Sequence, residues 1–194
     1  MTQNLNLKKE NNWAIQKSSK DCKVICFDEF GPLEIRPQLG ENWRKEPDKI
    51  PATYHRDKGI RCLFVALDLK KNKMYAHMKK RKRSNDFLAF LKYIRSLFKE
   101  KIFIILDNLS SHKTKKVKEW CKKNDIELVF TPTNASWLNR IECHLTALKK
   151  FTIRNSNYKN FKEMGSAIRK YIRWRNKNYE KYEIKKIENK HNFL

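Results

Sequence analysis

The stretch KIFIILDNLSSHKT, residues Lys101–Thr114, decides how the chain folds. Its five consecutive apolar residues, Ile102–Leu106, predict a strand that is buried on both faces, as strands inside an α/β sheet are. The next residue is Asp107. A carboxylate at the end of a buried strand costs free energy unless it has a partner or a function. Asp107 is therefore the first candidate site residue.

A second segment, CKVICFDEFG, repeats this pattern. Its apolar run, Val24–Phe27, predicts a strand, and Asp28 follows directly. If the two strands are parallel neighbours, both aspartates emerge at the carboxyl edge of the sheet, where open α/β sheets place their ligand sites. The sequence therefore predicts that Asp28 and Asp107 belong to one site.

The rest of the chain predicts alternating strands and helices around a long irregular stretch, Leu33–Arg56, that contains three prolines. The predicted elements are strands at 60–69 and 73–80, a helix at 84–98 capped by Ser84, the strand 102–106, a basic helix from Ser110 or Ser111, a strand at 125–130, a helix from about 136 to 151, and a last helix with a capping box at Asn160 and Glu163. This order predicts an α/β fold, a mixed sheet with helices on both faces, in which the first and fourth strands lie parallel.

A third acid, Glu142, lies in the helical segment SWLNRIECHLTALKKF. At 100° per residue it falls roughly 80° from the centre of the apolar stripe, on the rim of the buried face. Ionising three converging carboxylates costs free energy unless a cation neutralises their charge. Carboxylate oxygens are hard ligands, which Mg²⁺ and Mn²⁺ prefer. Two such ions are the usual apparatus for attack on a phosphodiester. Taken singly, each acid is better explained as a turn cap or a helix-surface residue, but the three together in a strongly basic chain favour a metal site.

The charge of the chain predicts a polyanionic partner. Its 194 residues suit one domain, and 45 Lys and Arg against 21 Asp and Glu give a formal net charge of +24. A lysine-rich genome would inflate this number, but nucleic acid explains it better. The residues predicted to meet the DNA backbone are the run Lys79, Lys80, Arg81, Lys82 and Arg83 and the helical Arg169, Arg173 and Lys177. In the long loop, Arg36, Trp43 and Arg44 are expected to stack on or grip a strand end.

The cysteine pattern and the length of the apolar runs indicate in which cellular compartment the protein is expected. The five cysteines are scattered, so we expect free thiols rather than disulfides or a zinc site. There is no signal-peptide pattern and no apolar run near the ~20 residues that span a bilayer. We therefore expect a cytoplasmic protein with no membrane partner.

Five motifs resemble those of the bacterial insertion-sequence transposases of the mariner-like DDE superfamily: FDEFGPLEIRPQLGENW, ATYHRDKGIRCLFVALDL, RKRSNDFLAFL, LDNLSSHKT and TPTNASWLNRIECHLTALKKF. The resemblance covers residues 22 to about 190. It implies an RNase H-like fold in which Asp28, Asp107 and Glu142 are the catalytic, metal-binding acids. The 34 residues between Asp107 and Glu142 match the spacing of this branch. It further implies two Mg²⁺ or Mn²⁺ ions, cleavage of element ends in double-stranded DNA, transfer of the freed 3′-hydroxyl, and a homodimer.

Three further residues are expected to support the acids. Asn108 and His112 resemble the family's D-N-x-x-x-H stretch, in which Asn108 would orient Asp107. For His112, contact with a phosphate or the metals and a purely structural role in the turn stay equally open. Asn139 is expected to form the turn before the helix of Glu142. Glu29 points to the opposite face of its strand from Asp28, and a structural role is expected for it.

We expect three segments: a polar tail or linker at 1–21, a catalytic domain at 22–178 and a basic, helical tail at 179–194. Because 21 residues are too few for a helix-turn-helix, we expect a catalytic half without that end-recognition region. Two alternatives stay open: a catalytically silent DNA-binding relic of a truncated element, and a nuclease of the same fold that only hydrolyses DNA.

Overall fold

The structure, a computed structural model, describes residues 22–38, 58–132 and 139–179. Its elements in chain order are β1 (Cys22–Glu34), β2 (Ile60–Asp68), β3 (Lys73–Lys79), α2 (Ser84–Leu97), β4 (Lys101–Leu106), η1 (Ser110–His112), α3 (Lys115–Lys123), β5 (Ile126–Phe130), α4 (Ile141–Thr152) and α5 (Phe161–Asn178). The predicted order of strands and helices is confirmed in this part of the chain. The tails predicted at 1–21 and from 180 onward lie outside the described residues.

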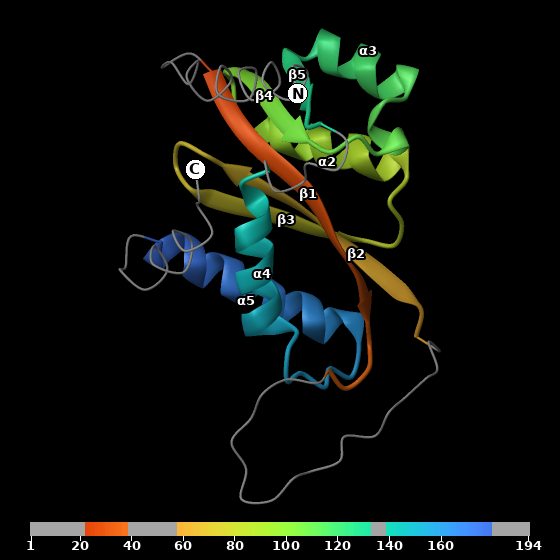
Figure 1. Cartoon of the computed structure of the whole chain (residues 1–194), viewed down its shortest axis with the longest axis vertical. Coiled ribbons are helices and arrows are strands. Elements are labelled where there is room, and N and C mark those ends of the chain that lie inside the picture. The colour runs from red at the N-terminus through yellow and green to blue at the C-terminus, as the bar shows by residue number, and fades with distance from the viewer. Residues whose placement is uncertain (1–21, 39–57, 133–138, 180–194) are drawn as a thin grey trace, which may run out of the picture.

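The strands form one mixed sheet in the order β3-β2-β1-β4-β5 (Figure 1). β1 pairs antiparallel with β2, and β2 pairs antiparallel with β3. β4 lies parallel to both β1 and β5. The predicted parallel pairing of the first and fourth strands is thus confirmed, and it brings the carboxyl ends of β1's parallel segment and β4 to the same edge.

Helices cover both faces of the sheet. On one face, Val24 and Cys26 of β1 pack in a core cluster with apolar residues of α4 and α5. On the other face, Ile25 and Phe27 pack with residues of α2 and α3. The alternation follows from the strand period of two residues, which sends neighbouring side chains to opposite faces. Figure 1 shows the two helix pairs on their two sides of the sheet.

The first strand is longer than the sequence predicted. The apolar run suggested that it ends at Phe27, but β1 continues to Glu34. It continues because β2 provides a partner for it, with Asp28 opposite Val65 and, after a register shift, Glu34 opposite Ile60. Pro32, which has no N–H to donate, lies within that shift. The irregular stretch predicted from Leu33 therefore begins later.

The helix boundaries also differ from the prediction at three places. Ser84 is the first residue of α2 rather than its cap, which is Arg83. Ser110 and Ser111 form the short helix η1, and the basic helix α3 begins only at Lys115. α4 is described from Ile141, and residues 133–138 lie outside the described part. No described helix has both the length and the apolar character that crossing a membrane requires.

The cap of α5 agrees with its predicted start. The Glu163 backbone N–H donates to the Asn160 side-chain oxygen at 2.9 Å. The Glu163 carboxylate accepts from the backbone N–H of Lys159 at 2.8 Å, one residue before the usual position in a capping box. Four of the five cysteines, Cys22, Cys26, Cys62 and Cys121, are buried, and Cys143 is half-buried.

Candidate active site

Asp28 and Asp107 lie beside each other across the parallel pair of β1 and β4. The described pairing runs from Cys22 opposite Lys101 to Cys26 opposite Ile105. Two more residues in the same register place Asp28 opposite Asp107. Both aspartates continue the alternation that points toward the face covered by α4 and α5. The sequence prediction that these two residues belong to one site agrees with this arrangement.

The position of Asp28 within its strand differs from the prediction. It does not end β1 but lies inside it, paired on one side with Val65 of β2. On its other side β4 ends at Leu106, so Asp28 lies where β1 loses its parallel partner. The carboxyl edge of the sheet is therefore a local edge, created by the end of β4 rather than by the end of β1.

Asn139 occupies this local edge. Its side-chain N–H donates to the backbone oxygen of Phe27 at 2.7 Å, and the residue is buried. The Asn139 backbone oxygen in turn accepts from the N–H of Glu142 at 3.1 Å. Asn139 therefore attaches the start of α4 to β1 next to Asp28, which is a more specific role than the turn former that the sequence suggested.

Glu142 lies in the first turn of α4 and is half-buried. It is close enough to Asp28 for its charge to act on that residue. Burial raises the pKa of Asp28 to about 7, the neighbouring N–H of Glu29 opposes this, and the charges of Asp107, Glu29 and Glu142 add to the rise. The structure thus brings Asp107 and Glu142 within electrostatic reach of Asp28.

Asp107 is held through one of its two carboxylate oxygens. Its Oδ1 accepts from the Leu109 backbone N–H at 3.2 Å and lies 3.1 Å from His112 Nδ1. The hydrogen bond from His112 lowers the pKa of Asp107, burial opposes this, and the Leu109 N–H and the charge of His112 add to the lowering. Asp107 is therefore ionised at neutral pH, with about half of its side chain exposed to solvent.

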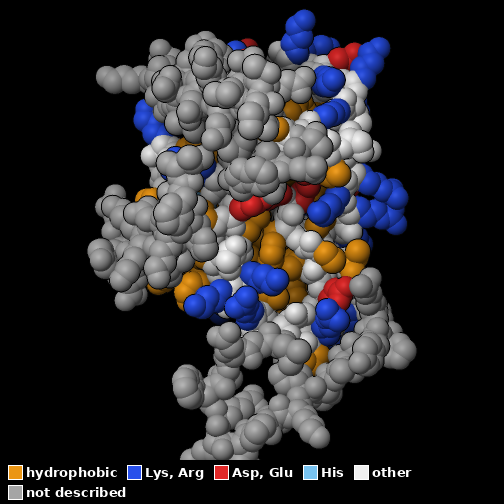
Figure 2. Space-filling view, viewed as in Figure 1, with side chains coloured by type: hydrophobic (Ala, Val, Ile, Leu, Met, Phe, Trp, Pro, Cys, Tyr) orange, Lys and Arg blue, Asp and Glu red, His pale blue; other side chains and the backbone are white. Residues whose placement is uncertain are grey.

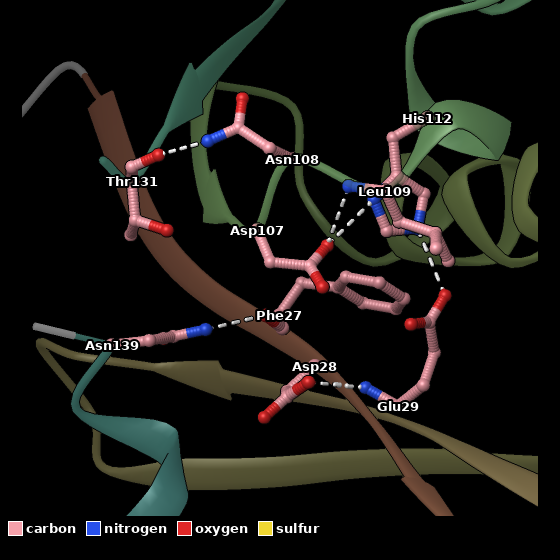
Figure 3. Close-up of polar contacts among 9 residues, drawn as sticks. All are labelled: Phe27, Asp28, Glu29, Asp107, Asn108, Leu109, His112, Thr131 and Asn139. Carbon is pink, nitrogen blue, oxygen red and sulfur yellow. Dashed lines mark hydrogen bonds and ion pairs between the residues drawn. The ribbon is translucent and has the colours of Figure 1, made fainter. Parts of the chain in front are cut away.

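His112 is fully buried between two carboxylates. Its Nε2 lies 2.8 Å from Oε1 of Glu29, whose side chain is almost completely buried. Burial alone would lower the pKa of His112, but the bonds and charges of Asp107 and Glu29 raise it to about 9. A ring without exposed surface does not reach a phosphate, which removes that part of the sequence hypothesis. Figure 3 shows the ring between the two acids.

Asn108 differs from its predicted role. Its side-chain N–H donates to the backbone oxygen of Thr131, just beyond β5 (Figure 3). It therefore ties the loop that follows β4 to the segment that follows β5, and it orients Asp107 only through the backbone. No local sequence pattern indicates this partner, because Thr131 is 23 residues away along the chain.

Two clusters in this region were compared as metal sites. Ligand atoms of Glu29, Asp107 and His112 lie within 4.8 Å of one another. However, both ring nitrogens of His112 already face carboxylates, so the ring has no nitrogen left for a metal. Asp28, Asp107 and Glu142 offer only carboxylate oxygens, the ligands that Mg²⁺ and Mn²⁺ prefer. The raised pKa of Asp28 marks a cluster that a divalent cation would relieve, so these residues fit the expected metals.

Basic side chains lie near the acids. The run Lys79–Arg83 connects β3 to α2, and its last four residues are exposed. The charge of Lys82 contributes to the lowered pKa of Asp107 and is therefore close to the site. Figure 2 shows a small acidic group on this face with Lys and Arg side chains around it. Arg169 and Arg173 are exposed on α5.

The predicted loop residues are only partly described. Arg36 is exposed and forms an ion pair with Glu34, with Nε and Oε2 3.1 Å apart. Trp43 and Arg44 lie outside the described residues. The loop prediction thus gains no support from the contacts of Arg36.

Sequence reasoning missed a buried arginine that supports α4. Arg175 of α5 is 1% exposed, and its guanidinium donates to Nδ1 of His144 in α4 at 2.9 Å. It also donates to the backbone and side-chain oxygens of Asn72 in the turn after β2. The helical spacing of Arg175 could have indicated its burial, because it continues the apolar stripe of Met164, Ile168 and Ile172.

The family profile described as DDE superfamily endonuclease matches residues 23–165. The insertion element IS630 uncharacterized 39 kDa protein of Shigella sonnei is 22% identical over 173 residues, which are 85% of this chain and 50% of that protein. The chain thus spans about half the length of this curated relative.

Solved structures agree on the architecture. A mariner Mos1 paired-end complex with Mg has a TM-score of 0.70 at 13% identity and covers 97% of this chain and 58% of the Mos1 chain. The Mos1 strand transfer complex has a TM-score of 0.65 at 12% identity and covers 95% of this chain and 57% of the Mos1 chain. These likenesses confirm the expected RNase H-like fold. With the profile covering most of the sequence, the chain belongs to the DDE superfamily endonucleases.

Proposed function

We propose that this chain is the catalytic domain of a DDE transposase, which cleaves DNA strands with divalent metal ions and joins a 3′-hydroxyl end to target DNA. The observation that carries the proposal is the convergence of Asp28 and Asp107, in register on one face of the sheet, with Glu142 at the start of α4. The relatedness to the IS630 protein supports a transposition role.

In this proposal Asp28, Asp107 and Glu142 hold the metal ions. Two bound Mg²⁺ or Mn²⁺ ions would supply activation of the attacking hydroxyl and stabilisation of the leaving oxygen. The protein contributes the arrangement of the acids: the sheet register sets Asp28 beside Asp107, and Asn139 attaches the helix of Glu142 to the same edge. Such attachments matter because catalytic groups need placement within about 0.5 Å.

The proposed substrate is double-stranded DNA, both element ends and target. The exposed run Lys80–Arg83 contains Lys82, whose charge acts on Asp107, and Arg169 and Arg173 are exposed on α5. The Mos1 structures are described as paired-end and strand transfer complexes. By analogy we extend the proposal to a homodimer that acts on nucleoid DNA in the cytoplasm. The proposal includes contact of Trp43 and Arg44 with a DNA strand end.

The test is Mn²⁺-dependent nicking of supercoiled plasmid DNA by the purified protein. We expect the wild-type chain to nick and the Glu142→Gln variant to lose at least about 100-fold in rate, because one metal ligand loses its charge. Glu127→Gln is the matched control: Glu127 is an exposed residue of β5 that pairs with Lys101. Full activity of Glu142→Gln, or an equal loss in the control, would contradict the assignment.

A second assay separates transposition from hydrolysis. A labelled DNA duplex with a pre-cut 3′-hydroxyl end is incubated with the protein and a plasmid target, and we expect labelled, joined product. Hydrolysis without joining would identify a nuclease of the same fold. DNA binding without metal-dependent cleavage, in contrast, would identify a silent DNA-binding protein.

A further inference from the structure

We propose that Glu29 and His112 form a buried positioning pair that holds Asp107 through Oδ1 and leaves its Oδ2 available for a divalent cation. The inference rests on the proposed metal-dependent function. It assigns to Glu29 and His112 a role in the geometry of the metal ligands without direct contact to metal or DNA.

The first argument is the use of the two oxygens of Asp107. The Leu109 N–H and His112 Nδ1 both approach Oδ1, at 3.2 and 3.1 Å. One hydrogen bond, from the Leu109 N–H, and one ion-pair contact, with His112 Nδ1, thus hold the same oxygen and restrict rotation of the carboxylate. Because the described contacts of Asp107 use Oδ1, the carboxylate can offer Oδ2 toward Asp28 without breaking them. Figure 3 shows this orientation.

The second argument is the rigidity of His112. The ring has no exposed surface, and it packs against Phe87 with 4.2 Å and against Phe27 with 5.5 Å between ring centroids. Its Nε2 lies 2.8 Å from Glu29 Oε1. The Glu29 contact at Nε2 and the packing on both rings therefore fix the orientation of the imidazole, which sets the position of Nδ1 beside Asp107.

The third argument is that Glu29 connects to both aspartates. Its carboxylate reaches Asp107 through His112, and its backbone N–H donates to Asp28 Oδ1 at 2.7 Å. The contacts therefore run from Asp28 through Glu29 and His112 to Asp107, across both faces of β1 (Figure 3). Partners of this kind that orient metal ligands typically change metal affinity 10- to 100-fold when they are removed.

The main test measures Mn²⁺ affinity of the DNA-free protein by titration calorimetry, with thermal unfolding in EDTA measured in parallel. His112→Phe keeps an aromatic ring against Phe87 but removes both nitrogens. We expect its Kd for Mn²⁺ to rise about 10- to 100-fold. His77→Phe is the matched control, because His77 packs against the Phe90 and Tyr93 rings in the same helix-covered layer and should leave the Kd unchanged. An unchanged Kd in folded His112→Phe would overturn the inference.

Glu29→Gln keeps the shape of the pair and covers the case in which His112→Phe does not fold. We expect a several-fold rise in its Kd for Mn²⁺, and no additional rise when it is combined with His112→Phe, since Glu29 acts on Asp107 through the ring. A Kd for Glu29→Gln equal to the wild-type value, or losses that simply add, would contradict the proposed pair.

Asp107→Asn separates this inference from the proposed function. If the wild type binds Mn²⁺ and Asp107→Asn does not, Asp107 is a metal ligand as proposed. The His112 and Glu29 variants then test only the positioning pair. Absence of Mn²⁺ binding by the wild type would overturn both the proposed function and the inference.

Discussion

At the scale of single residues, Asp28 carries the largest electrostatic cost in the site. Burial, together with the charges of Asp107, Glu29 and Glu142, raises its pKa to about 7. In the unfolded chain the same carboxyl would titrate near 4. Between these values the folded protein binds the additional proton, so the stability of the metal-free protein falls as pH rises from about 4 through 7. Metal binding would recover this loss.

Replacing Asp28 with Asn removes that cost, because Asn keeps the side-chain oxygen that accepts from the Glu29 N–H. We expect Asp28→Asn to be more stable than the wild type by about 2–4 kcal/mol in EDTA at pH 8, with little difference at pH 4, and to be inactive with Mn²⁺. Urea unfolding at both pH values measures this.

The control for this variant is Asp125→Asn, an exposed site before β5 at the other end of the parallel strands. It should change stability by less than about 0.5 kcal/mol at either pH. Equal stability of Asp28→Asn and wild type at pH 8 would show that Asp28 does not carry the electrostatic cost described above.

Residue identity alone predicted the acids but not their support. Asp28, Asp107 and Glu142 stood out because a charge at the border of an apolar pattern is unusual. The contacts that support them could not be predicted, since the partners lie on other elements: His112 is 83 residues from Glu29, and Arg175 is 103 residues from Asn72. Such pairs depend on tertiary packing, which periodicity does not encode.

At the scale of elements, local signals predicted the type and order of the helices and strands, while pairing set their ends. The cap of α5 was readable because Asn160 and Glu163 are three residues apart in the chain. The end of β1 was not, because the strand follows its partner β2 beyond the apolar run. The start of α3 was displaced by η1, a short turn that the two serines did not distinguish from a longer helix.

Asn160→Ala tests the contribution of the α5 cap. Loss of the hydrogen bond to the Glu163 N–H should reduce the free energy of unfolding by about 1 kcal/mol. Denaturant melts measure the change, and Mn²⁺ affinity should be unaffected. Asn157→Ala, in the exposed segment before the cap, is the control and should have a smaller effect. Similar losses in both variants would argue against the cap as the source.

At the scale of the whole molecule, the net charge of +24 has a local concentration beside the acids. Lys80 and Arg81 are exposed in the run that places Lys82 near Asp107. The proposed cation site, next to this positive surface, would suit a polyanionic substrate.

Neutralising Lys80 and Arg81 together should weaken DNA binding and lower the slope of log K against log salt concentration by about 1–2, since each phosphate contact contributes about 0.9. The matched control is Lys122→Ala with Lys123→Ala, an equal change in charge at the end of α3 near the amino ends of the parallel strands. Fluorescence anisotropy at several salt concentrations measures both. The same slope change in both double variants would indicate general charge rather than a defined DNA surface.

The shared register of β1 and β4 also determines which length changes a gene of this kind can accept. Because side chains alternate along a strand, one codon inserted between Lys101 and Leu106 would turn Asp107 to the opposite layer and separate it from Asp28. Two inserted codons would restore its direction but displace it by about 6.6 Å along the strand. Insertions and deletions that leave a working enzyme should therefore be absent from β4 and should collect in surface connections that carry no ligand.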